Sequence, residues 1–304
     1  MDNNIYKKLE QVIDKEIIKY NEPLAKHNTM KVGGPCKALI EVRTVDDIVN
    51  SINFAKKNNI KYYILGNGSD VFATDKGFNG IIIKIAKYFS DIKRDGNFVT
   101  ATSGVGMPRL SMYCYNEGLK GLEFACGIPG TIGGGVRMNA GAYGSKMDLV
   151  VYQTKYLDEK GNIKTLSKED HEFRYRHSYF ADHPEYIIIE TTFKLEEGNK
   201  EEIKAIMDKN NAARREKQPL EYASSGSTFK RPEGYFVGKI IEESNLKGYH
   251  VGDAEVSTKH GGFVVNKGKA SAKDVMDVIE HVQKVIKENY GIDLETEVII
   301  IGEK

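Results

Sequence analysis

The chain has 304 residues, and its 44 Lys and Arg nearly balance its 43 Asp and Glu, which gives a formal net charge of +1. This balance gives no electrostatic reason to expect a nucleic acid or an acidic membrane surface as a partner. No apolar run approaches the roughly 18–20 residues of a membrane-spanning helix, and residues 1–20 lack the continuous apolar stretch of a secretory signal. We therefore expect a soluble cytoplasmic protein, and we take it to be a monomer.

Cysteine and histidine spacing argues against a disulfide framework and against a metal site. The 3 Cys are an odd number without a CxxC pair, which fits a reducing compartment. Three of the 7 His, at His171, His177 and His183, recur every six residues, so no two of them have the i, i+4 spacing of a helical metal site. We expect no metal ion.

Taken in chain order, the first 85 residues predict two helices and two strands. Apolar residues at helical spacing predict an amphipathic helix over residues 1–20. A second helix is expected after Thr44, because its hydroxyl can cap the helix and acidic residues follow in the first turn. Strands are expected at Lys61–Leu65 and Gly80–Ile85, with a glycine loop after the first of them.

The middle of the chain is rich in strands and turns. Strands are predicted at Phe98–Ser103 and Tyr186–Leu195, and a short helix is predicted at Met107–Asn116. Asp95–Asn97 has the composition of a tight turn. Residues 121–144 are rich in glycine and have neither a helical nor a strand period, so we assign no element there.

The last third predicts a mixture of helices and strands. A charged helix is expected within Glu196–Arg215, and a strand at Gly261–Asn266. The strongest helical pattern of the chain covers Ala272–Asn289, with Gly291 as its C-cap. A buried strand is expected at Glu297–Ile301.

The first candidate site is Gly66–Asp70, directly after a predicted strand. Glycines let the backbone approach a ligand and direct N–H groups at phosphate oxygens, and Ser69 can add a hydroxyl. A simple turn is at least as good an interpretation of this loop alone. The loop is not a Rossmann fingerprint, because no third glycine opens a helix.

The second candidate site is the glycine-rich stretch Gly127–Gly144. Glycine costs conformational entropy of about 0.5–1 kcal/mol relative to Ala in regular structure, so ordinary core segments do not accumulate it. Close approach of the backbone to a flat or phosphorylated ligand explains the composition. A flexible linker is the alternative, but Ile, Val, Met and Tyr within the stretch favour a ligand contact.

Three further segments carry side chains suited to chemistry. Phe173–Ser178 holds two arginines around a tyrosine, which is either a charged surface or a guanidinium fork for a carboxylate. Ser224–Pro232 is a serine-rich loop. Glu295–Ile301 begins with acids and continues as an apolar strand, and such acids are normally exposed unless a site lies there.

Together and in this order, these segments closely resemble the MurB family, the UDP-N-acetylenolpyruvoylglucosamine reductases of bacterial peptidoglycan synthesis. Asn28–Pro35, Leu246–Tyr249 and His260–Asn266 add to the resemblance, which runs from about residue 20 to the end of the chain. The resemblance implies an α+β fold of the PCMH or vanillyl-alcohol-oxidase type. Its parts would be FAD-binding subdomains at residues 1–85 and 86–198 and a C-terminal α+β substrate-binding domain at residues 199–304.

The resemblance implies non-covalent FAD as the cofactor and NADPH as the reductant, which would use the substrate cleft in turn. It also implies which residues contact FAD. They are Gly66, Asn67, Gly68, Ser69, Asp70, Gly127, Pro129, Gly130, Thr131, Gly133, Gly134, Asn139, Ala140 and Gly141.

The implied reaction reduces an enolpyruvyl ether to a D-lactyl ether. Reduced flavin gives a hydride to the alkene, and negative charge then develops as an enolate over the substrate carboxylate. By motif position, Arg176 and a protonated Glu297 would stabilise that charge, and Ser227 would donate the proton to the second carbon. Lys217 and His260 would lie at the substrate diphosphate or its surroundings.

Several positions depart from the family pattern. Asp70 stands where Asn is common, Arg231 where Asn often follows the Phe-Lys pair, and His260 where some members have Gln. The short spacing between Arg176 and Ser227 indicates the subtype that lacks an extra tyrosine-bearing loop. Two alternatives remain at this point: an FAD oxidase or dehydrogenase of the same fold, and a nucleotide-sugar binder without catalysis.

Overall fold

The computed structural model describes residues 3–303, and the chain clusters into two compact units. The first unit contains the residues up to Ile18, Ile40–Asn67 and Ile82–Arg214. The second contains Lys19–Leu39, Gly68–Ile81 and the residues from Arg215 onward. Each unit therefore draws on separate stretches of sequence. Our division of the chain at residues 85 and 198 stays a prediction.

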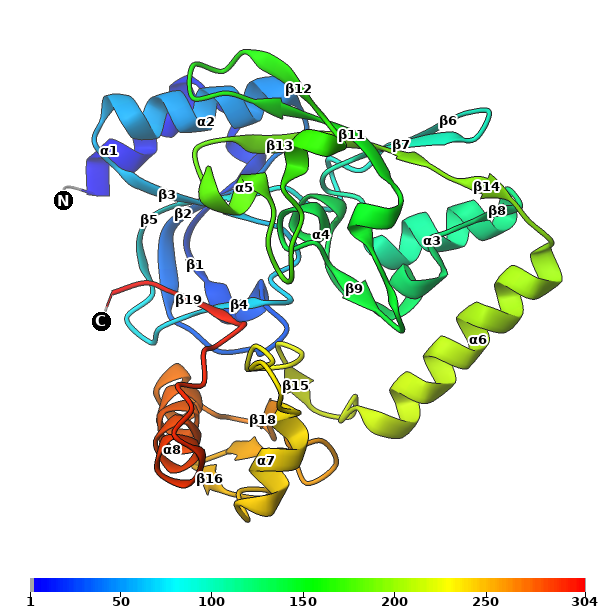
Figure 1. Ribbon diagram of the computed structural model, residues 1–304. Helices are drawn as coiled ribbons and strands as arrows, with labels where there is room; N and C mark the ends of the chain where they lie inside the picture. Colours follow the sequence, from blue (N-terminus) through cyan, green and yellow to red (C-terminus); the bar gives the residue numbers. More distant parts are fainter. Residues whose placement is uncertain (1–2, 304) are drawn as a thin grey trace. The chain divides into compact units, whose positions relative to one another are not determined.

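Figure 1 shows the elements along the chain, and both helices and strands are distributed over the whole sequence. The helices are α1 (Asn3–Lys7), α2 (Val45–Lys57), α3 (Met107–Asn116), α4 (Ile132–Arg137), α5 (Tyr179–Asp182), α6 (Lys200–Lys217), α7 (Val237–Glu243) and α8 (Ala272–Tyr290). The strands are β1 (Ile18–Pro23), β2 (Pro35–Glu41), β3 (Lys61–Leu65), β4 (Val71–Ala73), β5 (Phe78–Lys84), β6 (Ile92–Asp95), β7 (Phe98–Thr102), β8 (Leu119–Lys120), β9 (Gly141–Ala142), β10 (Ser145–Lys146), β11 (Val151–Leu157), β12 (Ile163–Ser167), β13 (Ile187–Lys194), β14 (Glu196–Glu197), β15 (Ala223–Ser224), β16 (His250–Val251), β17 (Ala254–Val256), β18 (Val264–Asn266) and β19 (Ile299–Ile301).

The first unit is built around an antiparallel sheet with the strand order β12-β11-β13-β7-β6. Helices α3 and α4 contribute buried apolar side chains to its core, among them Leu110, Ile132 and Val136, which pack in one cluster with Phe180 and Phe193. The predicted turn at Asp95–Asn97 joins β6 to β7, as expected. This packing fixes the backbone on either side of the glycine-rich stretch.

The second unit pairs the sheet β15-β18-β17-β16 with helix α8. One face of α8 is buried, and its residues include Val275, Val278 and Val282. Ser271 and Asp274 form a capping box at the start of α8, and Gly291 ends it with a φ of 70°. A parallel pair, β4 with β19, also belongs to this unit. A further sheet has the order β1-β2-β5-β3.

Three sequence predictions need correction. Among the described residues up to 20, no single helix forms: α1 ends at Lys7, short 3-10 turns follow, and β1 begins at Ile18. Asp14 caps one of these turns by accepting from the Glu16 N–H, which interrupts the amphipathic pattern. The unassigned glycine-rich stretch contains helix α4, which Thr131 caps. The last strand is only part-buried, and 38% of Ile300 is exposed.

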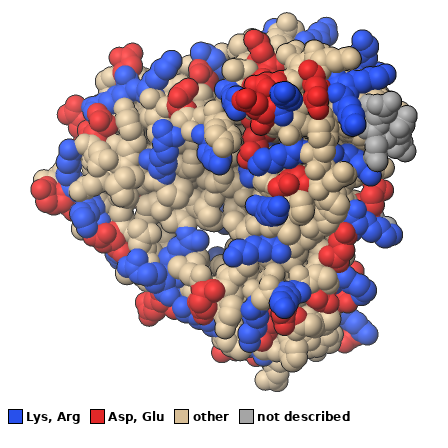
Figure 2. Space-filling model, turned by 180° about the vertical axis from the view of Figure 1, so that it is seen from behind, with Lys and Arg blue, Asp and Glu red and all other residues tan. Residues whose placement is uncertain are grey.

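Charges of both signs are interspersed over the face of the molecule in Figure 2, as the nearly balanced composition indicates. Within residues 3–303, no helix combines the length and the apolar character that crossing a membrane requires. Over the same residues, no group of three or more His, Cys, Asp or Glu side chains is arranged to hold a metal ion.

Candidate active site

In the first unit, the end of strand β3 lies against the glycine-rich stretch. The Asn67 side-chain amide donates to the Pro129 carbonyl over 2.9 Å. A Cβ atom at Gly66 would lie 2.5 Å from Thr131 Oγ1, closer than real Cβ atoms approach. Only glycine therefore fits at position 66. The structure brings together two segments that the sequence singled out separately and that stand 62 residues apart.

The start of helix α4 is held by backbone contacts with the segment after β7. The Ile132 N–H donates to the Val105 carbonyl over 2.8 Å, and the Gly133 N–H to the Ser103 carbonyl over 2.9 Å. A Cβ atom at Gly133 would lie 2.9 Å from Ser103 Cβ. Ser103 is buried, and its hydroxyl has no hydrogen-bond partner within the described part of the chain. Sequence reasoning did not single out Ser103, because nothing in its local pattern marks it.

The other predicted residues of the glycine-rich stretch surround this helix. The Gly130 carbonyl accepts a hydrogen bond from the Met107 N–H over 3.0 Å. Gly134 is exposed, and a Cβ atom added there would meet only Thr131 Oγ1, at 3.6 Å. Gly127 lies beside the guanidinium of Arg214. After the helix, Ala140 donates to the Gly135 carbonyl over 2.7 Å, and Gly141 begins the β9–β10 hairpin.

Arg176 stands at the tip of a tight hairpin. The backbones of Arg174 and His177 exchange two hydrogen bonds of 3.2 Å, so Tyr175 and Arg176 form the turn. Arg176 has a φ of 52°, the left-handed region that side chains other than glycine adopt rarely. Its guanidinium carbon lies 5.2 Å from the centre of the Tyr175 ring, which is exposed.

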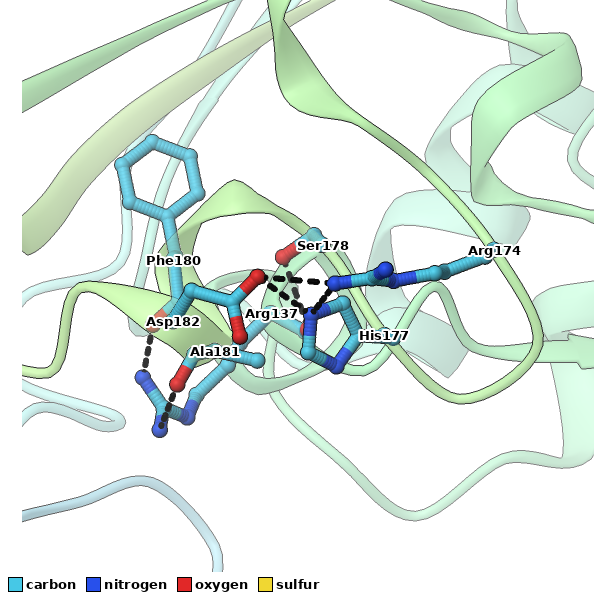
Figure 3. Close-up of polar contacts among 7 residues, drawn as sticks. All are labelled: Arg137, Arg174, His177, Ser178, Phe180, Ala181 and Asp182. Atoms are coloured by element: carbon cyan, nitrogen blue, oxygen red, sulfur yellow. Dashed lines mark hydrogen bonds and ion pairs between the residues drawn. The ribbon is translucent and has the colours of Figure 1, made fainter.

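Side chains close the base of this hairpin, as Figure 3 shows. Arg174 Nη2 donates to Asp182 Oδ2 over 2.8 Å, and His177 Nε2 lies 2.8 Å from the same oxygen. The hydrogen bond with His177 lowers the pKa of Asp182 below its usual range. The side-chain amide of Asn139, a buried residue with a φ of 43°, donates to the Arg174 carbonyl over 3.1 Å. The hairpin with Arg176 and the glycine-rich stretch are therefore directly connected.

In the second unit, the remainder of the first glycine loop packs against the Asn28–Pro35 motif. The Thr29 N–H donates to the Gly68 carbonyl over 2.9 Å, and Thr29 Oγ1 to the Ser69 carbonyl over 3.5 Å. Gly68 has a φ of +64°, and a Cβ atom there would lie 2.2 Å from the His27 carbonyl oxygen. The Asp70 carbonyl accepts from the Ile299 N–H at the start of β19.

Ser227 and Glu297 lie on neighbouring backbone segments of the second unit. Phe229 and Thr296 form an antiparallel bridge. The Glu297 N–H donates to the Thr228 carbonyl over 2.9 Å, which places Glu297 opposite the residue that follows Ser227. The adjacent Ser225 is 4% exposed, and its hydroxyl has no partner in the part of the chain that the structure describes.

His260 lies near this pair, whereas Lys217 belongs to a separate element, the end of helix α6. His260 Nδ1 accepts from the Gly262 N–H over 3.2 Å, and the Gly262 carbonyl accepts from the Thr228 N–H over 2.8 Å. Burial lowers the pKa of His260, and the Lys247 ammonium lowers it further. Lys217 is the exposed last residue of α6.

Comparison with known proteins gives the chain a family. A model described as "FAD binding domain" matches residues 36–167, and one described as "UDP-N-acetylenolpyruvoylglucosamine reductase, C-terminal domain" matches residues 218–301. The UDP-N-acetylenolpyruvoylglucosamine reductase of Clostridium novyi (strain NT) is 47% identical over 301 residues, which cover 99% of this chain and 97% of that protein. The chain belongs to the UDP-N-acetylenolpyruvoylglucosamine reductase family.

Further relatives agree with this family of reductases. The protein of that name from Clostridium perfringens (strain SM101 / Type A) is 48% identical over 98% of this chain and 97% of its own length. The crystal structure of the reductase (MurB) from Thermus caldophilus matches with a TM-score of 0.79 and 33% identity, over 91% of this chain and 97% of that chain. A glucose dehydrogenase, Phl p 4.0202, shares the fold at a TM-score of 0.52 and 12% identity. The predicted MurB family and FAD-binding α+β fold are confirmed.

The residues of the first unit fit an FAD molecule. Gly134 is exposed, and apart from Thr131 Oγ1 at 3.6 Å the space where a side chain would stand is open, so the backbone there can approach a ligand closely. The buried Ser103 hydroxyl beside Gly133 lacks a partner among residues 3–303. A bound polar group is the kind of partner that an unsatisfied buried hydroxyl requires.

Proposed function

We propose that the chain reduces the enolpyruvyl group of UDP-N-acetylglucosamine enolpyruvate to a D-lactyl ether and so produces UDP-N-acetylmuramate for peptidoglycan synthesis. It is an FAD-dependent oxidoreductase that takes its electrons from NADPH. The observation that carries this proposal is the near full-length identity of 47–48% to reductases of that name. The pairing of the Ser227 and Glu297 segments supports it, because the proposed reaction needs both side chains near one substrate.

FAD, when bound, supplies hydride transfer from NADPH to the substrate alkene. The residues that would hold it are those of the first glycine loop, Gly66–Asp70, and of the stretch from Gly127 to Gly141. Gly134 would let the backbone approach the dinucleotide closely, and Ser103 would add a hydroxyl that the sequence did not predict. Thr131 and Asn139 would keep the backbone of this stretch in place.

The enolate that forms after hydride transfer needs stabilisation and a proton. The Arg176 guanidinium would bind the substrate carboxylate and remain charged throughout, since arginine does not deprotonate in proteins. Glu297, carrying a proton, would donate a hydrogen bond to the same carboxylate. The Ser227 hydroxyl would give its proton to the second carbon of the former double bond, because an enolate is basic enough to take a proton from so weak an acid.

Lys217 and His260 complete the proposed site. Both are proposed at the substrate diphosphate or its surroundings, and the contacts of His260 near Thr228 support this for His260. We also propose a cytoplasmic monomer. The three free cysteines, two of them buried, support a reducing compartment, and light scattering on the purified protein would test the monomer.

The two half-reactions, followed by flavin absorption without oxygen, test the proposed function. The purified protein should be yellow, NADPH should bleach it, and the enolpyruvyl sugar should restore the colour while UDP-N-acetylmuramate forms. A protein that stays colourless after FAD is added contradicts the proposal. So does a bleached flavin that the enolpyruvyl sugar does not reoxidise. Reoxidation by the keto product of a hydroxy acid, with none by the enolpyruvyl sugar, would instead identify a different flavoenzyme.

A further inference from the structure

Arg137 connects the glycine-rich stretch to the segment that follows the Arg176 hairpin. It is the last residue of α4, and its guanidinium donates to the Phe180 carbonyl and, over 3.5 Å, to the Ala181 carbonyl. Its own carbonyl accepts from the buried Ser178 hydroxyl over 2.7 Å. Figure 3 shows these contacts of Arg137 with Ser178, Phe180 and Ala181.

The same stretch also holds the other end of the hairpin. Asn139, two residues after Arg137, donates to the Arg174 carbonyl over 3.1 Å. Contacts from α4 and its exit therefore bracket Arg176 on both sides, at Arg174 and at Ser178. Arg176 has a φ of 52°, and a residue keeps this rarely populated conformation only when the surrounding structure holds it there. The contacts at Arg174 and Ser178 hold the backbone on either side of Arg176.

Burying the charged guanidinium of Arg137 has a desolvation cost, so the residue is poorly suited to filling space alone. Burial lowers its pKa, which means that the fold disfavours its charge, and its guanidinium donates to backbone carbonyls. An apolar side chain would fill the same space without desolvating a cation. A guanidinium that donates to two successive carbonyls instead fixes the direction of the backbone that it grips.

We propose that Arg137 is a positioning residue, which sets the place of Arg176 by fixing the backbone that follows it, from Ser178 to Ala181. The proposal rests on the proposed function, in which Arg176 binds the substrate carboxylate. In the proposed function, Arg137 contacts neither the substrate nor the flavin and acts only through the backbone that carries Arg176. Substitution of Arg137 should therefore slow only the half-reaction in which the enolpyruvyl sugar reoxidises the flavin, because negative charge develops on the substrate carboxylate in that step.

The test uses the FAD-loaded, full-length protein with Arg137→Met, and it follows the two half-reactions separately. Reoxidation by the enolpyruvyl sugar should slow by up to about a hundredfold, because a displacement of about 1 Å at a reacting group can cost that much. Reduction by NADPH and the affinity for FAD, measured by flavin fluorescence, should stay within about twofold, which is below the effect expected for any lost contact to a charged group. Arg137→Lys should recover part of the rate, because an ammonium can donate to one of the carbonyls.

A double-mutant cycle with Arg176→Met distinguishes positioning from a general structural role. If Arg137 acts through Arg176, adding Arg137→Met to Arg176→Met should slow reoxidation no further. Arg94→Met is the matched control, because Arg94 also donates to a backbone carbonyl of the first unit, that of Gly96. It should leave both half-reactions unchanged.

Two outcomes would overturn the proposal while leaving the proposed function intact. Additive effects in the cycle, or equal slowing of both half-reactions, would show that Arg137 only supports the fold. If Arg137→Met does not fold, Arg137→Lys takes its place, since it keeps the charge and gives up the second carbonyl contact of the guanidinium, and the same non-additivity with Arg176→Met is required of it. Failure of the unsubstituted protein to be reoxidised by the enolpyruvyl sugar would overturn the proposed function itself.

Discussion

The two units hold their proposed catalytic groups in different ways. Arg176 stands on a hairpin that side chains fasten, chiefly those of Asn139, Ser178 and Arg137. Ser227 and Glu297 lie on segments that the main chain fastens, through the bridge at Phe229 and the hydrogen bond from Glu297 to Thr228. Substitutions around Arg176 should therefore displace it, whereas the spacing of Ser227 and Glu297 should survive most changes of neighbouring side chains.

The largest expected effect is that of Ser227→Ala, which leaves the backbone pairing intact and removes only the proposed proton donor. Formation of UDP-N-acetylmuramate should fall by about 10²–10⁴, the usual contribution of a general acid. Flavin reduction by NADPH should survive, and single-turnover absorption measures both steps. Unchanged product formation would remove Ser227 from the mechanism. Equal loss of both steps would indicate damage to the fold, which circular dichroism would detect.

Arg176→Ala tests the region that depends on side chains. Loss of one preorganised group at a developing negative charge should lower the rate of flavin reoxidation by about 10²–10³. Arg176→Lys should recover only part of this, because an ammonium cannot make the two parallel hydrogen bonds of a guanidinium. An unchanged rate of flavin reoxidation in Arg176→Ala would show that Arg176 does not stabilise the developing charge.

Gly66→Ala separates the fold from the flavin site. The added Cβ would lie 2.5 Å from Thr131 Oγ1, and such overpacking should lower the free energy of unfolding by about 1–3 kcal/mol. Gly134→Ala is the matched variant, since its Cβ would meet Thr131 Oγ1 at an ordinary 3.6 Å. Thermal melts with and without FAD measure both. If Gly134→Ala weakens FAD binding without lowering the stability of the FAD-free protein, the ligand lies at Gly134. If both variants melt like the parent without FAD, the predicted clash at Gly66 is absent.

Mild acid should weaken the first unit through His171, with a smaller effect than the substitutions above. His171 is buried, its Nδ1 lies 2.6 Å from the Ser167 carbonyl and its Nε2 2.9 Å from Thr154 Oγ1. Burial lowers the pKa of His171 below its ordinary value of 6.5. Protons therefore bind the unfolded chain first, so the contribution of His171 is complete above about pH 6.5 and is lost as the pH falls further.

Denaturant melts between pH 7.5 and 5 measure this dependence. His171→Gln should make the free energy of unfolding less sensitive to pH in that range. The part-exposed His183, which lies 3.3 Å from Glu185, provides the matched control as His183→Gln. An unchanged pH dependence in His171→Gln would remove His171 as the cause.

Local signals in the sequence predicted the long helices well. The cap at Thr44, the regular pattern of α3 and the glycine at 291 fixed their ends within a residue or two. The prediction of a helix over residues 1–20 was wrong, because apolar spacing alone did not reveal that Asp14 caps a new 3-10 turn. Helix α4 was missed because its three consecutive glycines hide any period.

The site was predictable as segments and not as contacts. Family motifs identified the residues of each loop, but the approach of Gly66 to Thr131 and the pairing of Phe229 with Thr296 join segments far apart in the chain. Such pairings depend on the packing of whole elements, which no local pattern encodes. The roles of Ser103 and Arg137 had no sequence signal, because burial and hydrogen bonding alone distinguish them from other serines and arginines.

The second unit joins early and late parts of the chain. The Asn266 side chain donates to the Met30 carbonyl, Asp75 accepts from the first N–H groups of α8, and β19 pairs with β4. During translation, Met30, Asp75 and strand β4 must wait for these partners until nearly the whole polypeptide has left the ribosome. A product terminated before α8 and β19 would lack these contacts and should be more open to proteolysis than the full-length chain.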